Sequence, residues 1–137
     1  MKNFMLLGLV LLTLSACEIY VVEPAPTYDP RNNVVGSFTM DEYSETYNDY
    51  LTYSITISKS SNSGNQIYLY NFYDSEISIY AYVDSNKITI PYQVVNGYEV
   101  EGVGTLSGNT IYFTYRVKDI YNNTAADFCK TTAQRTY

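Results

Sequence analysis

Residues 87–118 decide the fold of this chain, and they read KITIPYQVVNGYEVEGVGTLSGNTIYFTYRVK. Three runs of β-branched and aromatic residues alternate with polar residues, a pattern typical of half-buried strands. Asn96-Gly97 and Ser107-Gly108-Asn109 separate the runs. Asn-Gly is the strongest short hairpin signal because both residues tolerate a positive φ. The stretch therefore predicts three antiparallel strands joined by tight turns.

The same alternation continues on both sides, from residue 34 to residue 136. Short connections imply antiparallel neighbours, because parallel strands need long crossovers. A regular spacing of about ten residues indicates a barrel or a sandwich. We expect an all-β domain, an antiparallel up-and-down meander of about eight strands in a small barrel, with a β-sandwich as the alternative. Strands are predicted at 34–43, 50–59, 66–73, 76–83, 87–95, 98–106, 110–118 and 126–136.

The two-residue period also predicts which side chains fill the core. Pro91 interrupts one strand and predicts an edge or a bulge there, because proline cannot donate to the ladder. The residues assigned to the core face are Ile55, Ile57, Ile67, Leu69, Ile77, Ile79, Ala81, Val83, Ile88, Ile90, Ile111, Phe113, Tyr115 and Val117.

Tyrosine is the unusual feature of the composition, with 17 residues among 137. Five of them fall on the predicted outer face. Cross-strand pairing is one interpretation, with each pair worth up to about 1 kcal/mol. An aromatic binding surface for a glycan, a peptide or another protein is the other, because tyrosine offers a large contact area at low entropic cost. The five are Tyr68, Tyr70, Tyr80, Tyr82 and Tyr112.

The first 16 residues have the order of a secretory signal peptide: the basic Lys2, an apolar run at 4–14, and small residues at 15–16. The run is shorter than the roughly 20 residues that span a bilayer. It is also apolar on all sides, unlike a helix on the surface of a globular core. We therefore expect export and removal of residues 1–16.

Leu14-Ser15-Ala16-Cys17 resembles the lipobox of bacterial lipoproteins. The resemblance implies that the Cys17 sulfur takes a diacylglyceryl group and that Cys17 becomes the first residue of the mature chain. Acyl chains such as palmitate anchor a protein because each buried methylene adds about 0.8 kcal/mol. The expected location is the bacterial cell envelope, on the outer membrane, with the periplasmic or surface side left open.

Residues 17–33 follow as the lipidated cysteine and a Pro-rich tether, and 34–137 form the barrel domain. Pro24, Pro26 and Pro30 favour an extended, stiff segment. If Cys17 carries lipid, Cys129 has no partner for a disulfide. We expect Cys129 to be a half-buried hydrophobe in the last strand, with a reactive thiol and an intermolecular disulfide as the alternatives.

Charge and composition exclude several functions. The mature part keeps seven of eight basic residues and all 14 acidic ones, a formal charge of −7. That balance argues against nucleic acid as a partner. The chain has no His, the commonest general base and zinc ligand. We expect no enzymatic activity, no cofactor and no metal. Solvated turns are predicted for Asp41, Glu42, Glu45, Asp49, Asp74 and Glu76, and solvent-facing positions for Glu99 and Glu101.

The stretch Gly102–Tyr115 resembles a hairpin of small bacterial envelope lipoproteins of lipocalin-like type. Val35-Gly36-Ser37-Phe38 is similar to the Gly-x-Trp that begins the first strand of lipocalins, with Phe38 in place of Trp. Arg135 matches the basic residue that covers this ring from the last strand. An eight-stranded barrel of this kind is filled by side chains or holds one small ligand.

Three functional hypotheses follow. The first is a lipid-anchored, non-enzymatic binding or interaction module, attached to the membrane through Cys17 and contacting another envelope protein or a glycan through its Tyr-rich outer face. The second is a lipocalin-like carrier of a small apolar ligand, which predicts a continuous internal cavity. The third is a carboxylate-dependent hydrolase, which needs two acids together in a concave site. The sequence contains no sign of such a site.

Overall fold

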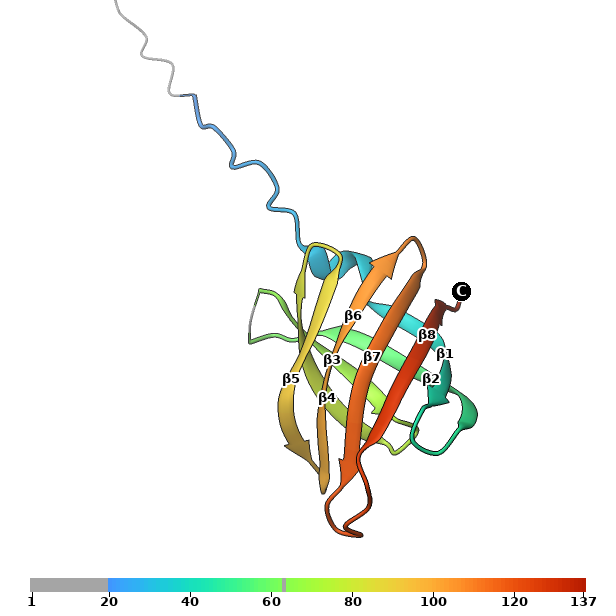
Figure 1. The fold of residues 1–137 in the computed structure, drawn as a ribbon. Coiled ribbons are helices and arrows are strands. Elements are labelled where there is room, and N and C mark those ends of the chain that lie inside the picture. Colours follow the sequence, from blue (N-terminus) through green and yellow to red (C-terminus); the bar gives the residue numbers. More distant parts are fainter. Residues whose placement is uncertain (1–19, 63) are drawn as a thin grey trace, which may run out of the picture.

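The computed structural model describes residues 20–62 and 64–137, which form a closed barrel of eight antiparallel strands (Figure 1). Each strand pairs with the next in sequence, and β8 closes the barrel against β1. The predicted up-and-down barrel is confirmed, with every strand boundary within two residues of its expected place. The strands are β1 (Gly36–Ser44), β2 (Asp49–Lys59), β3 (Gln66–Phe72), β4 (Ile77–Asp84), β5 (Lys87–Val95), β6 (Tyr98–Ser107), β7 (Thr110–Asp119) and β8 (Asp127–Arg135).

The predicted core face is buried, as expected from the two-residue period. The rings of Phe38, Phe72 and Phe113 are almost fully buried with it, and so is Met40. Large apolar side chains therefore occupy the middle of the barrel. The expected signal peptide and Cys17 lie outside the described residues. Within the described residues, no helix has the length and apolar character needed to cross a membrane.

The irregularity predicted at Pro91 is a bulge. The register between β5 and β6 shifts between Ile90 and Gln93. The buried Gln93 amide then replaces ladder bonds that the backbone cannot make beside Pro91. Its oxygen accepts from the Tyr80 N–H at 3.0 Å, and its nitrogen donates to the Tyr80 carbonyl at 2.8 Å. One side chain thus holds β4 and β5 together past the bulge.

One end of the barrel is closed by the chain that leads into β1. A 3-10 helix, η1 (Pro30–Asn33), lies at this end, and Val34 behind it is fully buried (Figure 1). The Arg135 guanidinium carbon lies 4.7 Å from the centre of the Phe38 ring. Its nitrogens donate to the carbonyls of Val35 at 2.5 Å and Asn33 at 2.6 Å. The structure thus places Arg135 over Phe38, as the lipocalin resemblance implies.

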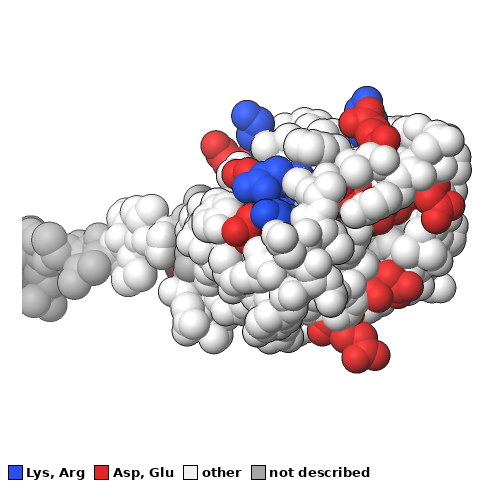
Figure 2. Space-filling model, turned by 60° about the horizontal axis from the view of Figure 1, so that its bottom comes forward, with Lys and Arg blue, Asp and Glu red and all other residues white. Residues whose placement is uncertain are grey.

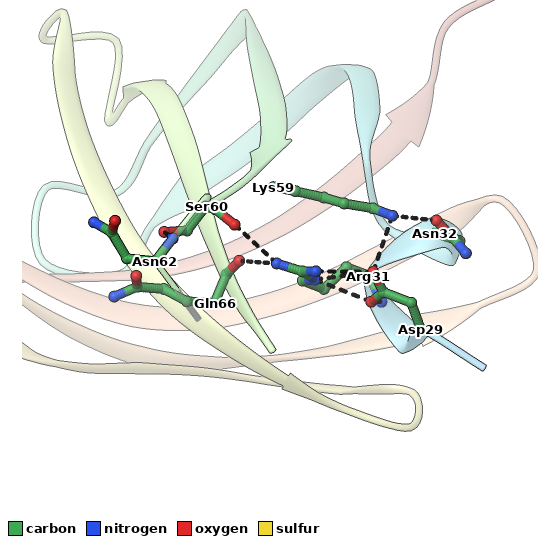
Figure 3. A network of polar contacts seen from close by, with 7 residues as sticks. All are labelled: Asp29, Arg31, Asn32, Lys59, Ser60, Asn62 and Gln66. Atoms are coloured by element: carbon green, nitrogen blue, oxygen red, sulfur yellow. Dashed lines mark hydrogen bonds and ion pairs between the residues drawn. The ribbon is translucent and has the colours of Figure 1, made fainter. Parts of the chain in front are cut away.

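A polar network fixes the chain to the barrel where the expected tether ends (Figure 3). Arg31 forms an ion pair with Asp29 at 2.9 Å and donates to the carbonyls of Ser60 and Gln66 at 3.0 and 3.3 Å. Lys59 contacts Asp29 from β2, also at 2.9 Å. These two cations hold the pKa of Asp29 well below its ordinary value. The chain therefore enters the fold at the η1 end.

Candidate functional site

The other end of the barrel is hollowed by a half-open cavity of about 290 Å³. Because hairpin turns alternate between the two ends of an up-and-down barrel, this end carries the turns that follow β1, β3, β5 and β7. It therefore lies opposite η1 and the incoming chain (Figure 1). The residues around the cavity are Glu42, Ser44, Tyr47, Asp49, Tyr50, Leu51, Tyr73, Asp74 and Asp127.

Glu42 forms part of the floor, and here the prediction of a solvated acidic turn is wrong. Only 4% of Glu42 is exposed. It follows Phe38 and Met40 on the inward face of β1, since alternate residues of a strand share a face. That periodicity was the signal in the sequence, but the clustering of acids around Glu42 favoured a turn.

Hydroxyl groups from neighbouring strands satisfy the Glu42 carboxylate. The Tyr53 hydroxyl of β2 donates to Glu42 Oε2 at 2.7 Å, and the Tyr115 hydroxyl of β7 donates to the same oxygen. Thr131 of β8 in turn donates to the Tyr115 oxygen at 3.1 Å. Burial raises the pKa of Glu42, and these hydroxyl donors oppose that shift. The floor is thus a buried acid held by a network of hydroxyl groups.

Asp127, the first residue of β8, is the second buried acid and is 3% exposed. The Ser44 hydroxyl donates to Asp127 Oδ1 at 2.5 Å, and the Tyr73 hydroxyl donates to Oδ2 at 2.7 Å. Burial raises the pKa of Tyr73, so this phenol keeps its proton and remains a donor. Asp127 therefore joins the start of β8 to the end of β1 and to the turn after β3.

Cys129 lies beside both acids and is 1% exposed, so the expectation of a half-buried residue understated its burial. Burial, together with the charges of Glu42 and Asp127, raises the pKa of the Cys129 thiol. It is therefore a protonated interior group, and its burial leaves no path to a thiol of another chain. Single donor atoms of Glu42, Asp127 and Cys129 lie within 4.8 Å of one another, the one described group of residues that could hold a metal ion.

The rim is aromatic and acidic. Tyr47 and Tyr50 are 53% and 77% exposed, and Asp49 and Asp74 are exposed as predicted. The Tyr50 ring packs against Tyr43 with centroids 4.7 Å apart. Four of the nine residues around the cavity are acids, and none is Lys or Arg. On the face drawn in Figure 2, the half of the molecule away from the incoming chain carries mainly acidic side chains.

The tyrosines predicted as an outer surface lie away from this cavity. Tyr68 of β3 pairs with Tyr80 of β4, and each contacts a second tyrosine of its own strand. The Tyr68–Tyr70 and Tyr80–Tyr82 ring centroids are 6.2 and 5.8 Å apart. Tyr112 lies on β7, which pairs with β6 and β8 rather than with β3 or β4. The structure thus brings four of the five residues together.

Glu99 and Glu101 also lie on the outer wall, where both contact Arg116. The distance between Arg116 Nη1 and Glu99 Oε2 is 3.8 Å, and Glu101 approaches Arg116 Nε more closely. These two acids face outward, as expected, and they do not line the cavity. The acid pair at the cavity is Glu42 and Asp127, and no pattern in the sequence predicts that these two residues meet.

No protein-family model matches the chain, and the search of curated proteins finds no match either. The candidate function therefore rests on the barrel, its cavity and the sequence signals at the N-terminus.

Proposed function

We propose that this protein is a lipid-anchored, non-enzymatic binding protein of the bacterial cell envelope, and that it holds a small ligand in the cavity at the open end of its barrel. The observation that carries the proposal is the half-open cavity of about 290 Å³. Ligand sites are typically concave, preformed and lined by a few converging polar groups, and the mouth of a β-barrel is a common place for them.

The proposed anchor determines which way the cavity faces relative to the membrane. Cys17, in the lipobox-like sequence, is proposed to carry the acyl chains. Residues 20–28, later in the expected tether, are exposed chain without regular structure. This chain enters the barrel at the η1 end, opposite the cavity (Figure 1). A protein attached in this way presents its open end away from the membrane, toward ligands in the surrounding compartment.

Binding is favoured over catalysis although Glu42 and Asp127 meet the spatial requirement for a carboxylate-dependent hydrolase. Hydroxyl groups of the protein already donate to both carboxylates, and each acid is less than 5% exposed. A general acid or base must reach the substrate at hydrogen-bond distance. Here Glu42 would first have to break its hydrogen bond with Tyr53, and Asp127 its hydrogen bond with Tyr73. The network is better suited to fix the shape and charge of a binding site.

A polar ligand is favoured over the apolar ligand of a lipocalin-like carrier. Phe38, Phe72 and Phe113 occupy the barrel interior. The cavity beyond them is lined by carboxylates and tyrosines. An apolar ligand would displace water from these polar groups without replacing its hydrogen bonds, which costs free energy. The four tyrosines together on β3 and β4 support a second candidate, contact of the outer wall with a glycan or an envelope protein.

A fragment screen observed by NMR tests the site. Amide and tyrosine signals of the mature lipoprotein in detergent micelles are followed during titration with small polar fragments. We expect the largest shifts at Tyr47, Tyr50 and Tyr73. Shifts confined to Tyr70 and Tyr82 would favour the outer wall instead. If no fragment moves the signals around the cavity, the proposed binding site is wrong.

Mass spectrometry tests the anchor. Protein isolated from membranes is expected to begin at Cys17 and to be heavier than its polypeptide by the mass of a diacylglyceryl group and its acyl chains. The Cys17→Ser variant should lack this added mass and should keep residues 1–16. A wild-type product that keeps residues 1–16 without lipid would contradict the anchor but leave the cavity untouched.

A further inference from the structure

We infer that the cavity takes a small organic cation, a protonated or quaternary amine, held between the acidic side chains and the tyrosine rings of the open end. This inference rests on the proposed binding function and names the class of ligand. Three observations carry it: the sign of the charge around the cavity, the aromatic groups at its rim, and its volume.

The charge comes from two levels of the site. Glu42 and Asp127 lie buried at the floor, and Asp49 and Asp74 lie exposed at the rim. None of the nine lining residues is basic, and the chain contains no His. Charges of one sign in a partly enclosed site act through low-dielectric walls, which focus their field into the opening. An anionic ligand is repelled there, while a cation is attracted both during its approach and when bound.

The tyrosines supply the second kind of contact. Tyr47, Tyr50 and Tyr73 all line the cavity. The Tyr73 ring packs edge-on against Tyr98 at 6.3 Å, and its hydroxyl is fixed on Asp127. The Tyr50 ring is supported by Tyr43. Aromatic rings attract cations through their faces. The cation–π contact found among the described residues, Arg135 over Phe38, lies at the other end of the barrel.

The volume favours an organic cation over a bare metal ion. A cavity of about 290 Å³ has roughly ten times the ~30 Å³ share of one water molecule, so a single ion would leave most of it to solvent. A metal on Glu42, Asp127 and Cys129 would also have to displace the hydroxyl groups of Tyr53, Tyr115, Ser44 and Tyr73 from the acids. An amine that enters from the rim leaves this network in place.

The test compares three probes with the same ring and different charges: benzylamine, benzyl alcohol and benzoate. Each is titrated by NMR into the mature lipoprotein in detergent micelles at low and high salt. We expect benzylamine to shift the signals of Tyr47, Tyr50 and Tyr73 and to bind at least about tenfold more tightly than benzyl alcohol. Benzoate should not bind, and added salt should weaken the binding of benzylamine.

Variants identify the charges responsible. Asp49→Asn and Asp74→Asn together should weaken benzylamine binding severalfold, since both acids are exposed and their loss leaves the buried network intact. Asp84→Asn is the matched control, because Asp84 is an exposed acid at the η1 end, and it should bind benzylamine like the wild type.

Several results would overturn the inference. Binding of benzyl alcohol at the cavity as tight as that of benzylamine would reject a cation site and keep the proposed function. Zn²⁺ or Ca²⁺ that displaces benzylamine at equimolar concentration would replace the organic cation with a metal ion. Failure of all three probes, while other polar fragments shift the cavity signals, would reject the amine class. Failure of every fragment would reject the binding function itself.

Discussion

Replacing Gly102 with alanine is expected to destabilise the barrel by about 3 kcal/mol, and replacing it with valine by more. A Cβ atom at this position would lie 2.6 Å from the Thr114 carbonyl oxygen and 2.8 Å from Tyr115 Cα. Both are backbone atoms of β7, so no side-chain rotation relieves the overlap. Strand propensity alone predicts that Gly102→Val stabilises the barrel, because valine is favoured over glycine in strands. That preference is at most about 1 kcal/mol. The steric term is larger and should win.

Urea unfolding measures this effect. Gly64→Ala is the matched control, since a Cβ at Gly64 meets nothing within 4 Å. We expect its free energy of unfolding to stay within about 0.5 kcal/mol of the wild type. A Gly102→Ala variant as stable as Gly64→Ala would show that β6 and β7 separate easily, and would contradict the close approach of these strands. Tyr115, which packs over Gly102, also donates to Glu42, so the cavity floor should change in the same variant.

The strands could be predicted from the sequence because their signals are local. Alternation such as that of Ile88 and Ile90, and turns such as Asn96-Gly97, depend on neighbours in the chain and on backbone sterics. The barrel closes because the last strand pairs with the first, as Phe38 and Arg135 do in the register of β1 with β8. Such a contact joins the two ends of the domain. The strand spacing left a sandwich open as the alternative, and the resemblance to lipocalins favoured the barrel.

The site was harder to predict because its residues are distant in sequence. Glu42 and Asp127 come from opposite ends of the domain, and neither has a motif around it. Glu42 stands among other acids, which gave the wrong prediction of a solvated turn. Alternation within the strands predicts five tyrosines on the outer face, but the tyrosines that line the cavity are others. Tyr47, Tyr50 and Tyr73 lie at strand ends and in turns. At such positions the two-residue period no longer tells which way a side chain points.

Glu42→Ala is expected to cost about 2–4 kcal/mol of unfolding free energy, because it leaves the buried hydroxyls of Tyr53 and Tyr115 without their acceptor, at roughly 1–3 kcal/mol for each unsatisfied group. Glu42→Gln keeps an oxygen for both donors and should cost much less. The comparison separates the hydrogen-bonding role of Glu42 from its charge. Equal losses in the two variants would contradict the network at the cavity floor.

The charge itself should appear in the pH dependence of stability. Burial raises the pKa of Glu42 above its ordinary value of 4.5, so the folded protein holds a proton that the unfolded chain releases. The stabilising contribution is therefore complete below the unfolded pKa and is lost as the pH rises through the folded pKa. The wild type should lose stability over this interval, whereas Glu42→Gln, which has no proton to release, should lose less. Glu23→Gln, in the exposed segment before the barrel, should follow the wild type.

Urea unfolding at a series of pH values from 4 to 8 measures the two slopes. The other titratable groups that face Glu42 are Tyr53 from β2, Tyr115 from β7, and Asp127 and Cys129 from β8. Burial raises the pKa values of both tyrosines and of the thiol, so these three stay protonated throughout this range. A slope that persists unchanged in Glu42→Gln would therefore contradict the assignment of this titration to Glu42. An organic cation in the cavity should reduce the wild-type slope, because a positive charge near Glu42 stabilises the carboxylate and brings its folded pKa back toward the unfolded value.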